Sequence, residues 1–250
     1  MTHPGALDRT NRAEIIQARI DLAAAFRCAA RLNMHEGVCN HFSVMLPDKR
    51  FLINPKGTHF ERMTASGLIL IDERGNTLEG TGRAPMTGYA IHTRIHLMHP
   101  TATAVLHLHA PYSTAITAIR GGRLEMVHQN SARFFGEIAY DDHFNGIAVQ
   151  PNEGERMASV MGGKRILFLA NHGVIVVGKS VAEAFDDFYY LERACQVQLM
   201  AMQSGRPLNV MSEDLARLTH EQFGLASINA DLHFSEMKAI LDTECPDYAS

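Results

Sequence analysis

Cysteine is scarce in this sequence, and no two cysteines are close enough to form a C-x-x-C pair. Cys28, Cys39, Cys195 and Cys245 are widely scattered along the chain. That pattern argues against a disulfide framework or a zinc knuckle, and it is typical of proteins in the reducing cytoplasm. We therefore expect the four thiols to be small core residues.

Long apolar runs and an excess of positive charge are also missing. No stretch approaches the roughly 20 apolar residues that a membrane-spanning helix needs. Residues 1–5 show no basic region followed by an apolar run, so we expect no secretory signal. The formal charge of −4 offers no general attraction to nucleic acid or to an anionic membrane. We expect a cytoplasmic protein that acts on a small molecule and attracts any anionic substrate locally.

The composition that is present is that of an ordinary globular protein, with 46% hydrophobic and 20% charged residues over 250 positions. This length suits one large domain. No internal repeat or linker-like shift in composition interrupts the chain. We expect a single α/β domain over residues 1–250, with a core at about 11–205 and a helical C-terminal appendage at 206–250.

Apolar periodicity predicts the main elements of this domain. Helices are expected at 11–33, 87–98 and 181–203, and at 228–241 after an amphipathic segment that begins near the N-cap residue Ser212. Pro111 suits the first turn of another helix. Strands are expected at 42–46, 51–54, 68–72, 103–109, 165–170 and 174–177.

Fourteen histidines are the most distinctive feature of the sequence. His107 and His109 alternate in a strand-like run, so both side chains should project from the same face of a sheet. His172 lies in a turn between two hydrophobic strands, beside a glycine that permits a close approach of the backbone. Three imidazoles around one ion leave an open coordination position, as in a catalytic metal site.

Simpler roles for these histidines stay open. The three could be core or surface histidines that are hydrogen bonded to carbonyl groups, and two ligands alone are fewer than zinc usually has. His92 and His96 are one helical turn apart and could chelate a metal, but they could equally cap or pack.

Several short motifs together resemble the class II aldolase/adducin family. They occur in family order over about residues 11–205: GVCNHFS at 37–43, NPKG at 54–57, APMTG at 84–88 leading to His92, the H-x-H of His107 and His109, and NHG at 171–173. The resemblance implies a three-layer α/β/α sandwich around a mostly antiparallel sheet, and a homotetramer with sites at subunit interfaces. It also implies that His107, His109 and His172 hold one divalent ion per subunit, Zn²⁺ or alternatively Mn²⁺ or Fe²⁺.

The sequence departs from the pattern of the sugar-phosphate aldolases at three positions. Their Pro-Ser-Ser-Glu stretch, with its acid/base glutamate, is matched by residues 85–88, where the glutamate is replaced by Gly88. An asparagine of their phosphate-binding Gly-Asn-x-Ser motif is replaced by His41, and the serine of their Pro-Ser-Gly turn by Lys56. Retro-aldol cleavage needs a base, whereas decarboxylation starts from a carboxylate that is already ionised.

These departures favour a decarboxylase-like lyase. Lys56 could pair with a substrate carboxylate, or simply be solvated, and Gly88 could leave room for a flat ring. Tyr140, His41 or His92 could protonate the carbanion, although Tyr140 could instead be a packed core residue, and Glu36 could supply the missing carboxylate. The resemblance and these arguments give the expected substrate-binding set: Asn40, Ser43, Lys56, Gly57, Thr87 and Gly88.

Three other functions stay open at this stage. An aldolase could use another side chain as its base, and aldehyde rather than CO₂ would then be its product. A non-catalytic interaction module like the adducin head would fold without metal, although a scaffold has no evident need for three ligand imidazoles. A metal-dependent oxygenase would consume oxygen.

Overall fold

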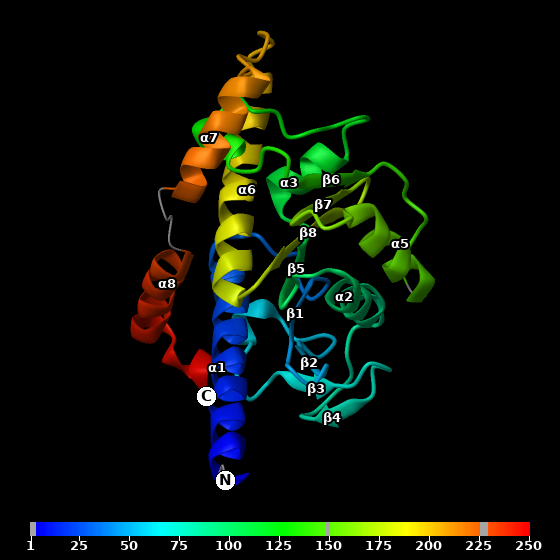
Figure 1. Ribbon diagram of the computed structural model, residues 1–250, viewed down its shortest axis with the longest axis vertical. Coiled ribbons are helices and arrows are strands. Elements are labelled where there is room, and N and C mark those ends of the chain that lie inside the picture. Colours follow the sequence, from blue (N-terminus) through cyan, green and yellow to red (C-terminus); the bar gives the residue numbers. More distant parts are fainter. Residues whose placement is uncertain (1–3, 149–150, 226–229) are drawn as a thin grey trace.

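The computed structural model describes residues 4–148, 151–225 and 230–250, and one sheet of eight strands runs through them (Figure 1). The strands are β1 (His41–Met45), β2 (Phe51–Ile53), β3 (Ile69–Ile71), β4 (Thr77–Glu79), β5 (Ala104–Leu108), β6 (Ile138–Asp141), β7 (Ile166–Leu169) and β8 (Gly173–Gly178). Their order is β4-β3-β2-β1-β5-β8-β7-β6. Every neighbouring pair is antiparallel except β6 and β7, which are parallel.

Helices cover both faces of this sheet. They are α1 (Pro4–Arg31), α2 (Met86–Met98), α3 (Pro111–Thr117), α4 (Gln129–Ala132), α5 (Pro151–Met161), α6 (Val181–Met202), α7 (Glu213–Leu225) and α8 (Ala230–Glu244), with short 3-10 turns η1 (Phe60–Arg62) and η2 (Pro246–Ala249). One buried cluster joins α1, α6 and α8 to one face, and another joins α2 and α5 to the opposite face (Figure 1). The predicted three-layer α/β/α sandwich around a mostly antiparallel sheet is confirmed.

The alternation of side chains along β5 decides what each layer receives. This strand is central, pairing with β1 on one side and β8 on the other. Ala104, Leu106 and Leu108 enter the core beneath α1 and α6. Val105 belongs to the cluster beneath α2 and α5, so His107, two residues on, faces that same layer. A polar residue thus occupies a strand position where burial is complete on both faces.

Helix α1 is buried almost all round in its second half. Residues 22–26 and 28–30 are all buried, because the helix contacts the sheet, α6, α8 and η1. Phe26 stacks on Phe42 of β1 with ring centroids 4.5 Å apart. The Phe60 ring meets Phe26 edge to face, with centroids 4.5 Å apart and an angle of 82° between the ring planes. The single apolar stripe predicted for this helix therefore understates its buried surface.

Helix α8 packs on the outer side of the α1/α6 layer, and α7 contacts α4 (Figure 1). Phe234 and Leu241 of α8 belong to the same hydrophobic cluster as α1 and α6. Lys238 of α8 also pairs with Asp21 of α1 at 2.7 Å. Ser212 caps α7 as predicted, since its hydroxyl accepts a hydrogen bond from the Leu215 amide. No helix among the described residues is both long and apolar enough to cross a membrane.

The predicted elements differ from the structure mainly at one edge of the sheet. The six predicted strands are present with no end shifted by more than one residue, and α1 begins earlier than predicted. Strand β6 and helix α5 were not predicted, because β6 is only half-buried and α5 has Gly154 as its fourth residue. The short helix α4 and the exposed strand β4 were also given no bounds from the sequence. Residues 228 and 229 of the predicted C-terminal helix lie outside the described residues.

The aromatic cluster around Phe26 gives a direct test of this packing. Phe26→Ala removes a fully buried ring that contacts two others, so we expect the free energy of unfolding to fall by about 3–5 kcal/mol. Urea unfolding followed by circular dichroism measures the change. Ile16→Ala, at an exposed position on the same helix, should cost less than about 0.5 kcal/mol. Equal effects of the two substitutions would contradict the buried position of Phe26.

Candidate metal centre

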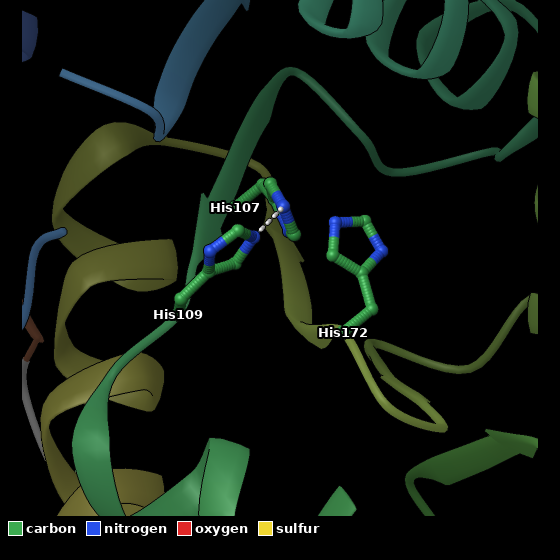
Figure 2. Close-up of side chains that lie close together, drawn as sticks. All are labelled: His107, His109 and His172. Atoms are coloured by element: carbon green, nitrogen blue, oxygen red, sulfur yellow. Dashed lines mark hydrogen bonds between the residues drawn. The ribbon is translucent and has the colours of Figure 1, made fainter. Parts of the chain in front are cut away.

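Three imidazoles from two loops and a strand converge on one point. His107 comes from β5, His109 follows two residues beyond it, and His172 reaches across from the turn between β7 and β8 (Figure 2). Their ring centroids form a triangle with sides of 5.0, 4.7 and 4.9 Å. One nitrogen of each ring lies within 4.8 Å of the other two. The predicted triad is therefore brought together by the fold.

Hydrogen bonds behind two of the rings fix which nitrogen is free to bind an ion. His107 Nδ1 lies 3.1 Å from the Val174 carbonyl oxygen, which can only accept, so Nδ1 carries the proton. His109 Nδ1 donates in the same way to Glu36 Oε2 at 2.6 Å. A neutral ring with its proton on Nδ1 has a bare Nε2, and this arrangement is the usual one behind metal-binding histidines.

The two bare nitrogens face each other, and this is the observation that fits a metal ion. His107 Nε2 and His109 Nε2 are 3.2 Å apart (Figure 2). With both protons on Nδ1, no hydrogen remains to join them, so their lone pairs repel unless a cation lies between them. Two nitrogens at 2.0–2.1 Å from a tetrahedral zinc ion are about 3.3 Å apart. The donor set therefore fits Zn²⁺, and imidazole also suits other transition metals.

The turn that presents His172 is built around a close approach of two strands. Asn171 adopts a left-handed conformation with φ of 57°, and its amide donates to the Thr117 carbonyl oxygen. A Cβ atom on Gly173 would lie 2.7 Å from both His109 Cδ2 and the Leu108 carbonyl oxygen. Only glycine fits there, which agrees with the close backbone approach predicted from the sequence.

Burial keeps two of the triad imidazoles, His107 and His172, neutral. Desolvation, reinforced by the neighbouring imidazoles, holds the pKa of His107 well below its ordinary value. The same two causes lower the pKa of His172 to about 4. Neutral imidazoles are the form that binds a metal ion, so ligands with lowered pKa values stay ready to bind under mildly acidic conditions.

The triad opens into a cavity of about 950 Å³ with an apolar mouth. Glu36 is the one carboxylate among its described lining residues, and Lys56 is the one lysine or arginine. Four large apolar side chains line the cavity and are exposed to solvent: Val38, Met86, Phe144 and Ile147. We call these four residues the apolar rim.

Apart from Tyr140, the predicted substrate-binding and catalytic residues divide into two groups. His41, Lys56, Gly57 and Thr87 line the cavity together with the triad. The others lie behind it and are buried: Asn40, Ser43, Gly88 and His92. The Asn40 side chain accepts a hydrogen bond from the Glu36 amide, which holds the turn that carries Glu36. His92 and His96 both bond Ser43 Oγ rather than a common ion.

Gly88 does not leave room for a substrate ring, contrary to one expectation from the sequence. A Cβ atom there would lie 3.1 Å from His41 Cγ and 3.2 Å from Ile53 Cδ1. The His41 ring itself fills the space beside Gly88. The exchange of glutamate for Gly88 and the presence of His41 are therefore two parts of one packing arrangement.

Tyr140 lies on the other face of the sheet from His107. It pairs in register with Phe168, whose side chain belongs to the α1/α6 core. Its hydroxyl accepts a hydrogen bond from the Leu124 amide at 3.1 Å, and burial raises its pKa to about 12. It lines a separate cavity with Arg123. Within one chain, the structure does not bring this predicted proton donor to the triad.

Sequence reasoning missed the groups that orient the triad. It raised Glu36 only as a replacement for the missing base, whereas the structure places Glu36 behind His109 as its hydrogen-bond acceptor. The Val174 carbonyl behind His107 follows from the register between β5 and β8. The available signal for Glu36 was a carboxylate directly before the GVCNHFS motif. Nothing in the sequence revealed the role of the Val174 carbonyl.

Comparison with known proteins gives matches over most of the chain. The sequence profile of the Class II Aldolase and Adducin N-terminal domain matches residues 20–199. The sequence is 32% identical over 206 residues to Decarboxylase NovR of Streptomyces niveus, covering 81% of this chain and 76% of that protein.

Solved structures agree with these sequence matches. An aldolase II superfamily protein from Pseudomonas syringae superposes with a TM-score of 0.88 at 31% identity, over 94% of this chain and 96% of that one. An L-fuculose 1-phosphate aldolase from Glaciozyma antarctica superposes with a TM-score of 0.83 at 28% identity, over 95% and 94%.

The contact between Glu36 and His109 predicts a change in metal affinity. Glu36→Gln removes the charged acceptor behind a ligand ring, so we expect zinc affinity to fall about 10–100-fold. Competition with a chromophoric chelator measures this. Glu61→Gln alters an exposed carboxylate beside His59, which does not line the cavity, and should leave affinity unchanged. Unchanged affinity in Glu36→Gln would show that this carboxylate does not support the ligand.

The buried imidazoles also predict how stability depends on pH. Desolvation lowers the pKa of His41 to about 3 and that of His96 to about 4, from an ordinary value of 6.5. Below pH 6.5 the unfolded chain takes up protons that these folded rings refuse, so stability falls as pH drops towards 4. Each ring contributes a slope of up to about 1.4 kcal/mol per pH unit.

Urea unfolding of metal-free protein between pH 7.5 and 4.5 checks this expectation. His96→Leu should reduce the slope, because one buried titrating ring is gone. Stability that stays level or rises as the pH falls would contradict neutral burial of these rings.

Proposed function

This chain belongs to the class II aldolase and adducin family, and we propose that it is a divalent-metal-dependent carbon–carbon lyase that decarboxylates a small carboxylate. The observation that carries the proposal is the composition of the cavity around the triad. No carboxylate there is free to act as a base among the described lining residues, because Glu36 is bonded to His109. A reaction that begins with an ionised carboxylate does not need that base.

Lys56 and the apolar rim support a carboxylate with an apolar body. The Lys56 ammonium group can pair with the carboxylate, and it lines the same cavity as the triad. The exposed side chains of Val38, Met86, Phe144 and Ile147 offer an aromatic or aliphatic body a surface that excludes water. A hydroxylated, oxo or aromatic acid matches both features.

The residues of the chain have distinct roles in this reaction. His107, His109 and His172 would hold the ion, which when bound supplies a Lewis acid that draws electron density from the substrate. Lys56 orients the carboxylate, and the apolar rim packs against the substrate body. The electron pair of the broken C–C bond stays on the substrate carbon as CO₂ leaves, and a proton then adds to that carbon.

Among the predicted proton donors only His41 lines the cavity. Burial lowers its pKa to about 3, so His41 is neutral near pH 7. Solvent water entering through the open mouth is the source of the proton that this arrangement supports. Tyr140 and His92 have no assigned role in the chemistry.

Aldol cleavage is the second candidate, favoured by the close superposition on an L-fuculose 1-phosphate aldolase. It requires a base to remove a hydroxyl proton. For either reaction we also propose a homotetramer, which the family resemblance suggests. The composition suggests a cytoplasmic location, which we propose as well.

Metal content and turnover should be lost together when the triad is broken. We expect nearly one zinc, manganese or iron ion per chain in the wild type and little in His107→Ala/His109→Ala, by mass spectrometry of protein purified without chelators. Release of CO₂ from a panel of hydroxy, oxo and aromatic carboxylates should fall at least about 100-fold. His220→Ala, on α7, should match the wild type in both measurements.

Each other outcome assigns a different function. Aldehyde without CO₂ would replace the decarboxylase with an aldolase. Full turnover in a metal-free variant would overturn the metal-dependent mechanism. Negligible metal in both proteins, with normal folding, would favour an interaction module of the adducin type.

A further inference from the structure

A continuous chain of hydrogen bonds runs from the cavity into the core between α2 and β1. It starts at Thr87, which lines the cavity, and ends at a backbone carbonyl group after α2. The successive contacts are Thr87 Oγ1 to His41 Nε2 at 3.2 Å, His41 Nδ1 to His92 Nε2 at 2.8 Å, His92 Nδ1 to Ser43 Oγ at 2.6 Å, Ser43 Oγ to His96 Nε2 at 2.7 Å, and His96 Nδ1 to the Ala102 carbonyl oxygen at 2.5 Å.

The buried end of the chain fixes the first two proton positions. A carbonyl oxygen only accepts, so His96 Nδ1 carries a proton and donates it to Ala102. His96 is neutral because it is buried with no carboxylate among its contacts, and its Nε2 is therefore a bare acceptor. The Ser43 hydroxyl must then donate to His96.

The same reasoning passes outward to the cavity. Since the Ser43 hydrogen is committed to His96, Ser43 Oγ accepts from His92 Nδ1. His92 Nε2 is then bare and accepts from His41 Nδ1. His41 Nε2 is bare in turn and accepts from the Thr87 hydroxyl. One carbonyl group thus orders every proton along the chain, because each neutral imidazole has one donor and one acceptor.

We propose that this ordered chain makes its cavity end, Thr87 Oγ1 beside His41, an acceptor-only site that selects substrates carrying a hydroxyl group. The Thr87 hydrogen is directed at His41, so only oxygen lone pairs face the ligand. A substrate hydroxyl can donate to them, whereas an ether or carbonyl oxygen at that place meets lone pairs. This inference rests on the proposed function and adds the functional group that the substrate must carry.

Packing places this acceptor beside the triad. The His41 and His107 rings are 4.9 Å apart between centroids, and these residues are paired in the β1–β5 register. Gly88 holds the His41 ring in place from the other side, because its Cβ-free surface lies directly against that ring. A substrate hydroxyl bound at Thr87 would therefore lie next to the metal ligands rather than at the mouth.

The proton positions can be read directly by NMR of metal-free protein labelled with ¹⁵N in the histidine rings. We expect His41, His92 and His96 each to show a proton on Nδ1 and a bare Nε2 at pH 7.5, with assignment by single His→Gln substitutions. In Ser43→Ala, His96 should keep its Nδ1 proton, while His92 and His41 should lose their single tautomer.

Ser131→Ala is the matched control. Ser131 is also fully buried, and its hydroxyl donates to the His128 carbonyl oxygen, which is not part of the hydrogen-bond chain. It should leave all three rings unchanged. Nε2 protons on His41 in the wild type, or an unaltered His41 in Ser43→Ala, would overturn the ordered chain.

Binding measures the selectivity. Calorimetry compares mandelate, which has a hydroxyl beside its carboxylate and an aromatic body, with O-methylmandelate, which has no hydroxyl hydrogen. We expect zinc-loaded wild type to prefer mandelate by about 10-fold or more. Thr87→Ser should keep this preference, and Thr87→Val and Ser43→Ala should reduce it several-fold.

The outcomes separate this inference from the proposed function. Equal preference in wild type, Thr87→Val and Ser43→Ala would overturn the acceptor-only site even if both acids bind. Binding of neither acid, together with the expected NMR pattern, would count against the carboxylate substrate of the proposed function while supporting the ordered chain.

Discussion

The need to satisfy every buried imidazole nitrogen shapes this molecule from the centre of the sheet outward. His107 occupies a strand position that is buried on both faces, where an unpaired polar group is costly. The antiparallel register between β5 and β8 brings the Val174 carbonyl to its Nδ1. The other nitrogen of His107, Nε2, is left facing Nε2 of His109, and a cation between the two nitrogens would offset the repulsion of their lone pairs. The candidate metal centre is thus a consequence of how the central strand is paired.

The same constraint explains the second group of histidines. His92 and His96 project from α2 onto the face of β1 that carries His41 and Ser43. Four polar side chains at a helix–sheet contact would destabilise the fold if any were left unpaired, and a fully connected set avoids that cost. Gly88 is part of this solution, because any side chain there would displace the His41 ring.

The sequence was sufficient for the elements with strong local patterns and for the histidines that the fold brings together. Alternation predicted that His107 and His109 share a face, and the glycine after His172 predicted the close turn. It was not sufficient for β6, whose half-buried residues give little alternation, or for the position of Tyr140 across the sheet. The register between β5 and β8 placed Val174 behind His107, and register depends on strand pairing that no local pattern reveals. The turn before β1 placed Glu36 behind His109.

The charge of the cavity and its apolar rim together restrict the class of ligand that can bind at the triad. The Glu36 carboxylate and the Lys56 ammonium group carry opposite charges, and burial keeps His107 and His172 neutral, so a divalent ion would leave an excess of positive charge in the cavity. That excess favours anions of every kind, phosphates included. The apolar rim does not favour sugar phosphates, because its four side chains, Val38, Met86, Phe144 and Ile147, offer no hydrogen-bond partner to a sugar. An anion with an apolar body satisfies both conditions, whereas a sugar phosphate satisfies only the first.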